Sequence, residues 1–302
     1  NYANIIRDKL NRLFSCYQYD SLYVIAGRST TVSYSELFER DFLAAVKLRL
    51  AKNNELDLYS KVQTVDEILM LEFMTRILSN KSILTKYKNI DKKTTQPQNF
   101  DYVEKKTFEI LKGEWINDNG EEKIIIDSHK SIDIRNSSSG QQEAIRILQD
   151  ILVVTIRGLP LLRIVEEPEA HLFPVAQKSL IELLALVVNQ NDDNQLIITT
   201  HSPYILTVFN NLLFAQRVVD KNPSAESEVS KLIPQEFWLK AEDFSAYSLG
   251  NSSIEEEPEY CESIFNQQTG VIKQNYLDEV SEMLGGDFNT LYSIYTKSSG
   301  RR

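Results

Sequence analysis

Apolar residues follow a helical spacing in four parts of the chain. They recur three and four positions apart over residues 35–88, which predicts a helical lobe, and again over residues 175–189. Between these segments, another helix is predicted by apolar residues at positions 144, 145, 148, 151 and 152. Gly158 and Pro160 are expected to end that helix, and a last helical pattern covers residues 271–297.

Short apolar runs predict the strands. The run "SLYVIAGRS" at residues 21–29 indicates a buried strand that ends in a glycine turn. The runs "LLRIV" at 161–165 and "QLIITT" at 195–200 bracket the helix over 175–189, and strand–helix–strand is the order of a parallel sheet. Both of these strands are expected to be central. The sequence therefore predicts an α/β fold with a parallel core.

A separate antiparallel unit is predicted between the helical lobe and the parallel core. The segments "FEILKGEWI" and "EEKIIID" flank residues 117–120, where an Asn-Gly pair gives a hairpin signal. The segment "SIDIR" is expected to add a third strand.

Composition limits the class of protein. With 42% apolar content in 302 residues the chain can bury a core, and its formal charge of −10 argues against a generally basic surface made for duplex DNA, although a local basic patch remains open. Cys16 and Cys261 are far apart and have no Cys or His companion, so no disulfide scaffold or zinc site is indicated. A reducing, cytoplasmic location fits this, and no apolar run of about 18 residues predicts a membrane span.

Two carboxylates follow the predicted strand over 161–165. Glu166 and Glu167 come directly after it, and ligands of open parallel sheets bind at the carboxyl ends of the strands. One carboxylate can hold Mg²⁺ while the other orients and deprotonates an attacking water. The alternative is that both glutamates favour the positive end of the next helix and lie in water.

Two further segments suggest phosphate chemistry. His201 directly follows the second parallel strand, where a histidine can reach a terminal phosphate, or can simply cap a helix. The segment "SSSGQQ" at 137–142 leads into a helix, whose first N–H groups can cradle a phosphate. Its alternative is an ordinary Ser N-cap.

The ordered set "SSSGQQ", "LLRIVEEPEAHLFP" and "IITTHSPYIL" closely resembles the carboxy-terminal half of an ABC-type ATPase head. The resemblance is to the SMC-like and OLD-like branch of bacterial AAA ATPases, and it is strong over residues 136–210. It implies an ABC-type P-loop NTPase head and a nucleotide-binding signature motif. The residues that match this motif are Ser138, Ser139, Gly140 and Gln141.

The same resemblance implies roles for the residues after each strand. Glu166 matches the Mg²⁺-linked acid of the Walker B strand, and Glu167 matches the catalytic glutamate. Ala170 and His171 fall in the D-loop region, which contributes to the nucleotide site, and His201 matches the switch histidine. Transporters usually have an aspartate where this chain has Glu166, but the carboxylate is kept and "EEPE" is familiar in the OLD-like branch.

The implied function is a cytoplasmic head that binds and hydrolyses ATP with Mg²⁺, forms a homodimer through an ATP sandwich, and acts as a switch. The resemblance suggests a bacterial nucleic-acid-linked or anti-phage defence system, with nucleic acid or an effector protein such as a nuclease as further partner. The phosphate-loop pattern GxxxxGK[ST] does not occur in the 302 residues. We expect a segment before Asn1 to hold it, and we expect the isolated chain to hydrolyse ATP poorly.

Two alternatives remain open. The chain could belong to an OLD-type ATPase–nuclease, but the residues after His201 look too few for its Toprim domain, and the acidic run "EEEPEYCE" reads more simply as a solvated loop. It could also be an interaction module that binds nucleotide without turnover. The expected regions are a core strand with a flanking helix, the helical lobe, the ATPase head and a carboxy-terminal extension, at residues 1–30, 31–100, 101–215 and 216–302.

Overall fold

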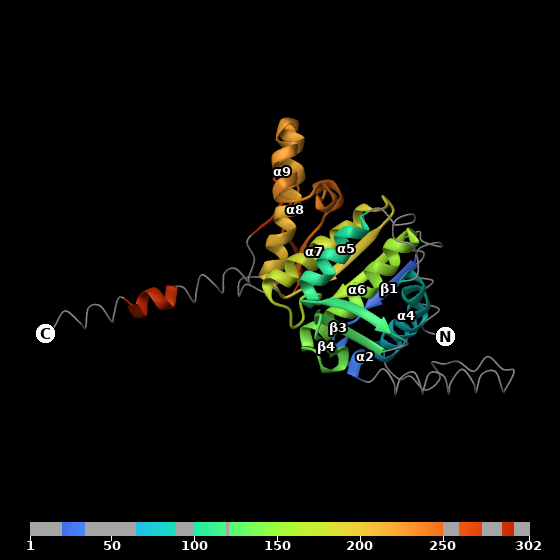
Figure 1. Ribbon diagram of the computed structural model, residues 1–302. Helices are drawn as coiled ribbons and strands as arrows, with labels where there is room; N and C mark the ends of the chain where they lie inside the picture. Colours follow the sequence, from blue (N-terminus) through green and yellow to red (C-terminus); the bar gives the residue numbers. More distant parts are fainter. Residues whose placement is uncertain are drawn as a thin grey trace. The chain divides into compact units, whose positions relative to one another are not determined.

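The computed structural model describes residues 20–33, 65–88, 99–118, 121–249, 260–273 and 286–292 (Figure 1). The chain divides into two units, residues 1–200 and 201–302, and each is described by itself. Much of the predicted helical lobe, Cys16, the Asn-Gly turn at 119–120 and most of the acidic run near 255 lie outside the described residues. The four expected regions stay a prediction.

A parallel sheet forms the centre of the first unit. It contains β1 (Asp20–Val24), β5 (Leu161–Glu166) and β6 (Gln195–Thr199) in the order β1-β5-β6. Val24 pairs with Val165, and Glu166 pairs with Thr199. The carboxyl ends of the three parallel strands therefore lie at the same end of the sheet. This confirms the α/β fold with a parallel core.

One expectation about this sheet is wrong. Both strands that bracket the 175–189 helix were expected to be central, but β6 lies at an edge of the sheet that the described residues form. Its Ile197 is 41% exposed, whereas Val165 of the central strand β5 is 1% exposed. A run of apolar residues predicts a strand, but it carries no information about how many neighbours that strand pairs with.

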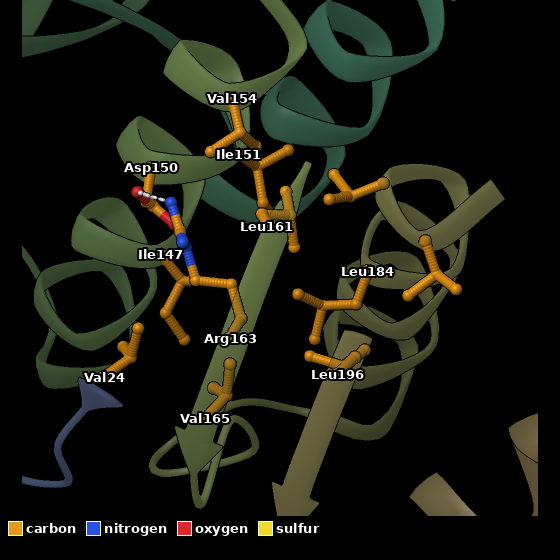
Figure 2. Close-up of a pocket in the computed structure, with 12 residues that line it drawn as sticks. Val24, Ile147, Asp150, Ile151, Val154, Leu161, Arg163, Val165, Leu184 and Leu196 are labelled. Atoms are coloured by element: carbon orange, nitrogen blue, oxygen red, sulfur yellow. Dashed lines mark hydrogen bonds and ion pairs between the residues drawn. The ribbon is translucent and has the colours of Figure 1, made fainter. Parts of the chain in front are cut away.

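Two predicted helices cover one face of the sheet. They are α6 (Ser139–Arg157) and α7 (Pro174–Asn189), which agree with the apolar spacing that predicted them. Gly158 ends α6 in the left-handed conformation, with φ 61°, where glycine has no steric penalty. Both helices line a pocket together with alternate residues of β5, which places them over the same side of this strand (Figure 2).

Two further helices pack around α6. Helix α4 (Val65–Lys88) contacts α6 and β1, and α5 (Phe100–Leu111) contacts α6 and α7. Residues 108–111 were expected to belong to a strand, but they form the end of α5. The reason is that Ile110 and Leu111 continue the buried face begun by Val103, at helical spacing. A short helix, α2 (Ser29–Ser33), follows β1.

The antiparallel unit is confirmed. It consists of β2 (Glu114–Asp118), β3 (Glu121–Asp127) and β4 (Lys130–Asp133), each paired antiparallel to the next. Arg146 of α6 donates to both carboxylate oxygens of Glu122 on β3, at 3.0 and 2.8 Å, and both side chains are buried. This ion pair joins the antiparallel unit to the helix that covers the parallel sheet.

Within the described residues, the second unit contains helices and two small strand pairs. Its elements are α8 (Pro203–Lys221), α9 (Glu226–Leu232), β7 (Tyr247–Leu249) with β8 (Cys261–Ser263), and β9 (Phe265–Asn266) with β10 (Val271–Ile272). The helical pattern expected to begin at residue 271 is therefore wrong at its start. Gly270, with φ 63°, makes a tight turn that lets Val271 and Ile272 pair back on Phe265 and Asn266.

The rest of the described chain forms short elements. Residues 286–292 are helical, and 3₁₀ turns occur at Ile134–Asn136, Pro223–Ala225, Gln235–Phe237 and Ala241–Asp243. In the second unit the ring of Phe244 contacts those of Phe209 and Phe265, with centroids 5.4 and 5.1 Å apart. None of the helices in the described residues has the length and apolar character needed to span a bilayer.

Candidate functional site

The last residue of β5 presents a carboxylate at the edge where the parallel strands end. Glu166 is half-buried, and its Oε2 accepts a hydrogen bond from the backbone N–H of Ala26 at 2.9 Å. Ala26 lies in the loop that follows β1, so the carboxylate is held between the ends of two neighbouring strands. Its position agrees with the rule that ligands of open α/β sheets bind at the carboxyl ends of the strands.

The next residue, Glu167, has an unusual backbone conformation. Its φ of 41° lies in the left-handed region, which a non-glycine residue rarely adopts. The surrounding contacts hold it there, because its N–H donates to the carbonyl of Thr199 at 2.9 Å and its own carbonyl accepts from Arg28 Nη2 at 2.9 Å. Strained residues of this kind cluster at functional sites. The strand end therefore turns sharply and carries a half-buried carboxylate at the turn.

A third carboxylate, to which the sequence motifs gave no role, lies in the same turn. Glu169 accepts a hydrogen bond from the hydroxyl of Thr200 at 2.6 Å, directly after the end of β6. Together with the bond from Glu167 to Thr199, this contact ties the turn after β5 to the end of β6. The two strand ends that were predicted to be neighbours are therefore joined.

Arg28 lies behind this turn, and sequence reasoning missed it. Its side chain is fully buried, and Nη1 donates to the carbonyl of Glu166 at 2.6 Å. Burial lowers the pKa of the Arg28 guanidinium from its ordinary value, and the neighbouring carboxylates, Glu143 first among them, oppose that shift. The only signal in the sequence was an arginine placed directly after the glycine turn of a predicted strand.

The predicted signature motif meets the predicted D-loop region. At Gly140 a β-carbon would lie 2.4 Å from the carbonyl oxygen of His171, so only glycine fits this close approach without a shift. His171 itself is exposed and has a left-handed φ of 60°. The structure thus brings together the start of α6 and the turn that follows Glu167.

Two other signature residues form a helix cap. The Ser138 hydroxyl accepts from the N–H of Gln141 at 3.3 Å, and the Gln141 side chain accepts from the N–H of Ser138 at 2.9 Å. This reciprocal pair is a capping box, which is the alternative stated for this segment from sequence. Ser138 and Ser139 are exposed. Their assignment to a nucleotide stays a prediction, since the cap already uses the Ser138 hydroxyl and the N–H groups of Ser138 and Gln141.

His201 begins the second unit, two residues after the end of β6. It is exposed, and the N-cap position of α8 is taken by Ser202 rather than by the histidine. Its assignment as the switch histidine stays a prediction. Among the described residues, no group of three or more His, Cys, Asp or Glu side chains is arranged to hold a metal ion.

Comparison with known proteins identifies the family. The crystal structure of the Smc head domain with an extended coiled coil, bound to the carboxy-terminal domain of ScpA and derived from Pyrococcus furiosus, is 15% identical with a TM-score of 0.27. The match covers 60% of this chain and 50% of that one, so the chain spans about half the length of that protein. No curated protein matches the sequence. Residues 10–206 match the model of the AAA ATPase domain, and the chain therefore belongs to this family.

Proposed function

We propose that this chain is an ATP-binding and ATP-hydrolysing head of the ABC type, from the SMC-like and OLD-like branch, that dimerises on ATP and acts as a switch. The observation that carries the proposal is the strand-end turn, where Glu166 and the strained Glu167 meet the end of β6. Membership of the AAA ATPase domain family supports ATP as the substrate.

The proposed chemistry divides between the two carboxylates. Glu167 accepts the proton of the water that attacks the terminal phosphate, as a general base. Glu166 is suited to hold Mg²⁺, because this ion is bound in proteins by one or two carboxylates together with waters and substrate phosphates. The metal would neutralise phosphate charge. His201 is proposed to contact the terminal phosphate and the attacking water.

The proposed assembly is a dimer in which two chains enclose two nucleotides. Residues Ser138 to Gln141 of one chain face the nucleotide held beside Glu167 of the other, so each site is shared. Such a two-fold contact is isologous, and each copy supplies what its partner needs. The exposure of Ser138 and Ser139 at the start of α6 supports this arrangement. The phosphate-loop pattern GxxxxGK[ST] does not occur in the 302 residues.

The experiment that tests the shared site mixes two inactive variants of the complete protein. Ser138→Arg places a bulky cation where the start of α6 closes on phosphate, and Glu167→Gln removes the base. In a mixed dimer one site keeps both native residues while the other carries both changes. Mixing is expected to restore part of the ATP hydrolysis of the wild type, which neither variant has alone, provided that one intact site suffices. Full activity of Ser138→Arg as a monomer would contradict the proposal.

A matched control separates the cation from the helix cap. Ser138→Ala removes the same capping hydroxyl, which costs about 1 kcal/mol of stability, but it adds neither charge nor bulk. A difference in ATP-driven dimerisation between Ser138→Ala and Ser138→Arg is then due to the cation. Equal dimerisation by the two variants would contradict a direct contact with phosphate.

For the cellular role, we propose a switch in the bacterial cytoplasm, in a nucleic-acid-linked or anti-phage defence system. ATP binding would favour the dimer and hydrolysis would end it, and an effector such as a nuclease would be active in only one of these two states. The test is whether the purified complete protein activates its effector with ATP and fails to do so when Glu167 is replaced by Gln. Activation that is independent of nucleotide would contradict a switch.

A further inference from the structure

A buried carboxylate joins the loop after β1 to α6. The Glu143 side chain is 2% exposed, and its two oxygens accept hydrogen bonds from the backbone N–H groups of Arg28 and Ser29, both at 3.0 Å. Bonds of this kind, from backbone N–H groups to an ionised carboxylate, are shorter and stronger than those between neutral groups. Because Glu143 lies in the second turn of α6, it fixes this loop to the start of that helix.

The guanidinium of Arg28 continues the connection from the loop to the end of β5. It donates to the carbonyl of its own loop residue Ile25 at 2.9 Å and to the successive carbonyls of Glu166 and Glu167 at 2.6 and 2.9 Å. In the other direction, the N–H of Ala26 donates to the Glu166 carboxylate at 2.9 Å. The main chain and one side chain of the strand end are therefore both held by the loop.

A second contact links α6 to the same turn. Gly140, in the first turn of the helix, approaches the carbonyl of His171 so closely that a β-carbon would lie 2.4 Å from the oxygen. The first two turns of α6 thus touch the turn after β5 directly through Gly140 and indirectly through Glu143 and Arg28. Close-packed groups of this kind transmit a displacement because they leave little room to move separately.

We propose that Arg28 and Glu143 are positioning residues that tie the Glu166–Glu167 strand end to the start of α6, so that a movement of this helix displaces the two carboxylates. The inference rests on the proposed ATPase function, in which Ser138 to Gln141 close on a nucleotide bound by a second copy. When the start of α6 in one chain closes on the nucleotide beside Glu167 of its partner, it also sets the position of Glu167 in its own chain. That glutamate acts on the second nucleotide of the dimer. The two sites of the dimer are coupled through this buried connection.

Two single substitutions in the complete protein test the connection. Glu143→Gln keeps the size of the side chain but replaces one accepting oxygen with an NH₂ group, which cannot accept from Arg28 or Ser29. Arg28→Lys keeps the charge but loses the fork of donors that serves the three carbonyls. Each change is expected to lower kcat about 10- to 100-fold, the cost of a small misplacement of reacting groups, with the Kd for ATP unchanged. The double variant should be no slower than the slower single one, because both act on one connection.

The matched control is Asp150→Asn. Asp150 lies seven residues after Glu143, about two turns along the same face of α6, and pairs with Arg163 near the other end of β5. This change also disturbs a buried arginine–carboxylate pair, but it is expected to leave kcat at the wild-type value. A readout that needs no catalysis is amide hydrogen exchange. Glu143→Gln should speed exchange in peptides covering residues 25–29 and 166–172, whereas Asp150→Asn should leave those peptides unchanged.

The outcomes distinguish a failure of the positioning role of Arg28 and Glu143 from a failure of the proposed ATPase function. If Glu143→Gln and Asp150→Asn show the same exchange over residues 166–172 and the same kcat, the positioning role is overturned. If the complete wild-type protein fails to hydrolyse ATP, the proposed function is wrong, and the exchange comparison still decides whether Glu143 holds the strand end. Faster exchange at the strand end in Glu143→Gln alone, together with a lower kcat and an unchanged Kd, is the result we expect.

Discussion

Two buried arginines hold opposite ends of the same sheet, and they do so in different ways. Arg163 of β5 bonds two carboxylates. Its Nε and Nη2 donate to the two oxygens of Asp150 at 2.6 and 3.2 Å (Figure 2), and Nη2 also donates to the Asp20 carboxylate at 3.4 Å. Its Nη1 donates to the carbonyls of Asp20 and Leu162. Arg28, at the other end, bonds mainly carbonyls, including those of Glu166 and Glu167. Arg163 therefore bonds carboxylates as well as main chain, whereas the hydrogen bonds of the Arg28 side chain all go to main-chain carbonyls.

The pKa values of the two arginines are also shifted in opposite directions. Burial acts on both and lowers the pKa of a guanidinium. At Arg163 the carboxylates of Asp150 and Asp20 outweigh burial, and the pKa is raised above its ordinary value. At Arg28 burial prevails over the carboxylate of Glu143, and the pKa is lowered. Nearby carboxylates therefore compensate the burial of Arg28 less fully than they compensate that of Arg163.

Backbone strain also separates the two ends. Four non-glycine residues in the described chain have a positive φ, and two of them, Glu167 and His171, lie in the turn after β5. The left-handed residue near the other end of this strand is Gly158, for which the conformation is unstrained. Backbone strain clusters at functional sites, and here it lies beside the catalytic candidates, whereas the left-handed residue at the opposite end is an unstrained glycine.

The largest expected effect on stability comes from the Arg163 end. Arg163→Met leaves the buried Asp150 without its cation, while Asp20 keeps Arg76, and removing one partner of a buried pair costs about 3–5 kcal/mol of the free energy of unfolding. Urea unfolding of the variant measures this loss. The double variant Arg163→Met with Asp150→Leu should recover part of it, because a buried charge is removed as well. A loss below about 1 kcal/mol for the single change would show that the ion pair contributes little to the free energy of unfolding.

A smaller effect is expected where α6 meets the turn. Alanine normally favours a helix over glycine, but Gly140→Ala places a β-carbon 2.4 Å from the carbonyl oxygen of His171. The shift needed to relieve this contact should cost about 1–3 kcal/mol in thermal unfolding. The control is Gly158→Ala, which meets no atom within 4 Å and is strained only by its φ of 61°. Stabilisation by Gly140→Ala would contradict the close contact.

The smallest effect concerns the ion pairs that Lys106 of α5 makes within α5 and with α7, away from both arginines. Lys106 contacts Glu182 at 2.7 Å and Glu109 at 3.1 Å. Burial alone would raise the pKa of Glu109, but hydrogen bonds from Lys106 and Ser179 lower it below 4.5. Because the folded pKa is below the unfolded one, the stabilisation is present above the unfolded pKa and is lost as pH falls through the folded pKa.

The measurement for this pair is the free energy of unfolding against pH, for the wild type and for Glu109→Gln. The difference should be less than about 1 kcal/mol at neutral pH, since Glu109 is partly exposed, and should shrink in acid. High salt should reduce it as well. A difference that stays constant from neutral pH to acid would mean that the glutamate contributes no charge interaction.

The sequence was sufficient for features that depend on local pattern. The apolar spacing in α6 and the runs in β5 and β6 predicted these elements, and the strand-end rule placed Glu166 and Glu167 at one edge. It could not reveal Arg28 and Glu143, because they lie 115 positions apart and meet only in the folded chain. The edge position of β6 and the pairing of Val271 and Ile272 likewise depend on partners that no local pattern specifies.

We propose that the carboxyl end of the sheet, and not the Arg163 end, carries out ATP hydrolysis with Glu167 as the base. The most direct measurement is single-turnover hydrolysis of ATP by the complete protein, alongside ATP binding, for the wild type and Glu167→Gln. The amide is nearly isosteric but cannot accept the proton of water. The rate should therefore fall about 10²- to 10⁴-fold while the Kd for ATP is unchanged. A wild-type rate in Glu167→Gln would place the base elsewhere and contradict the claim.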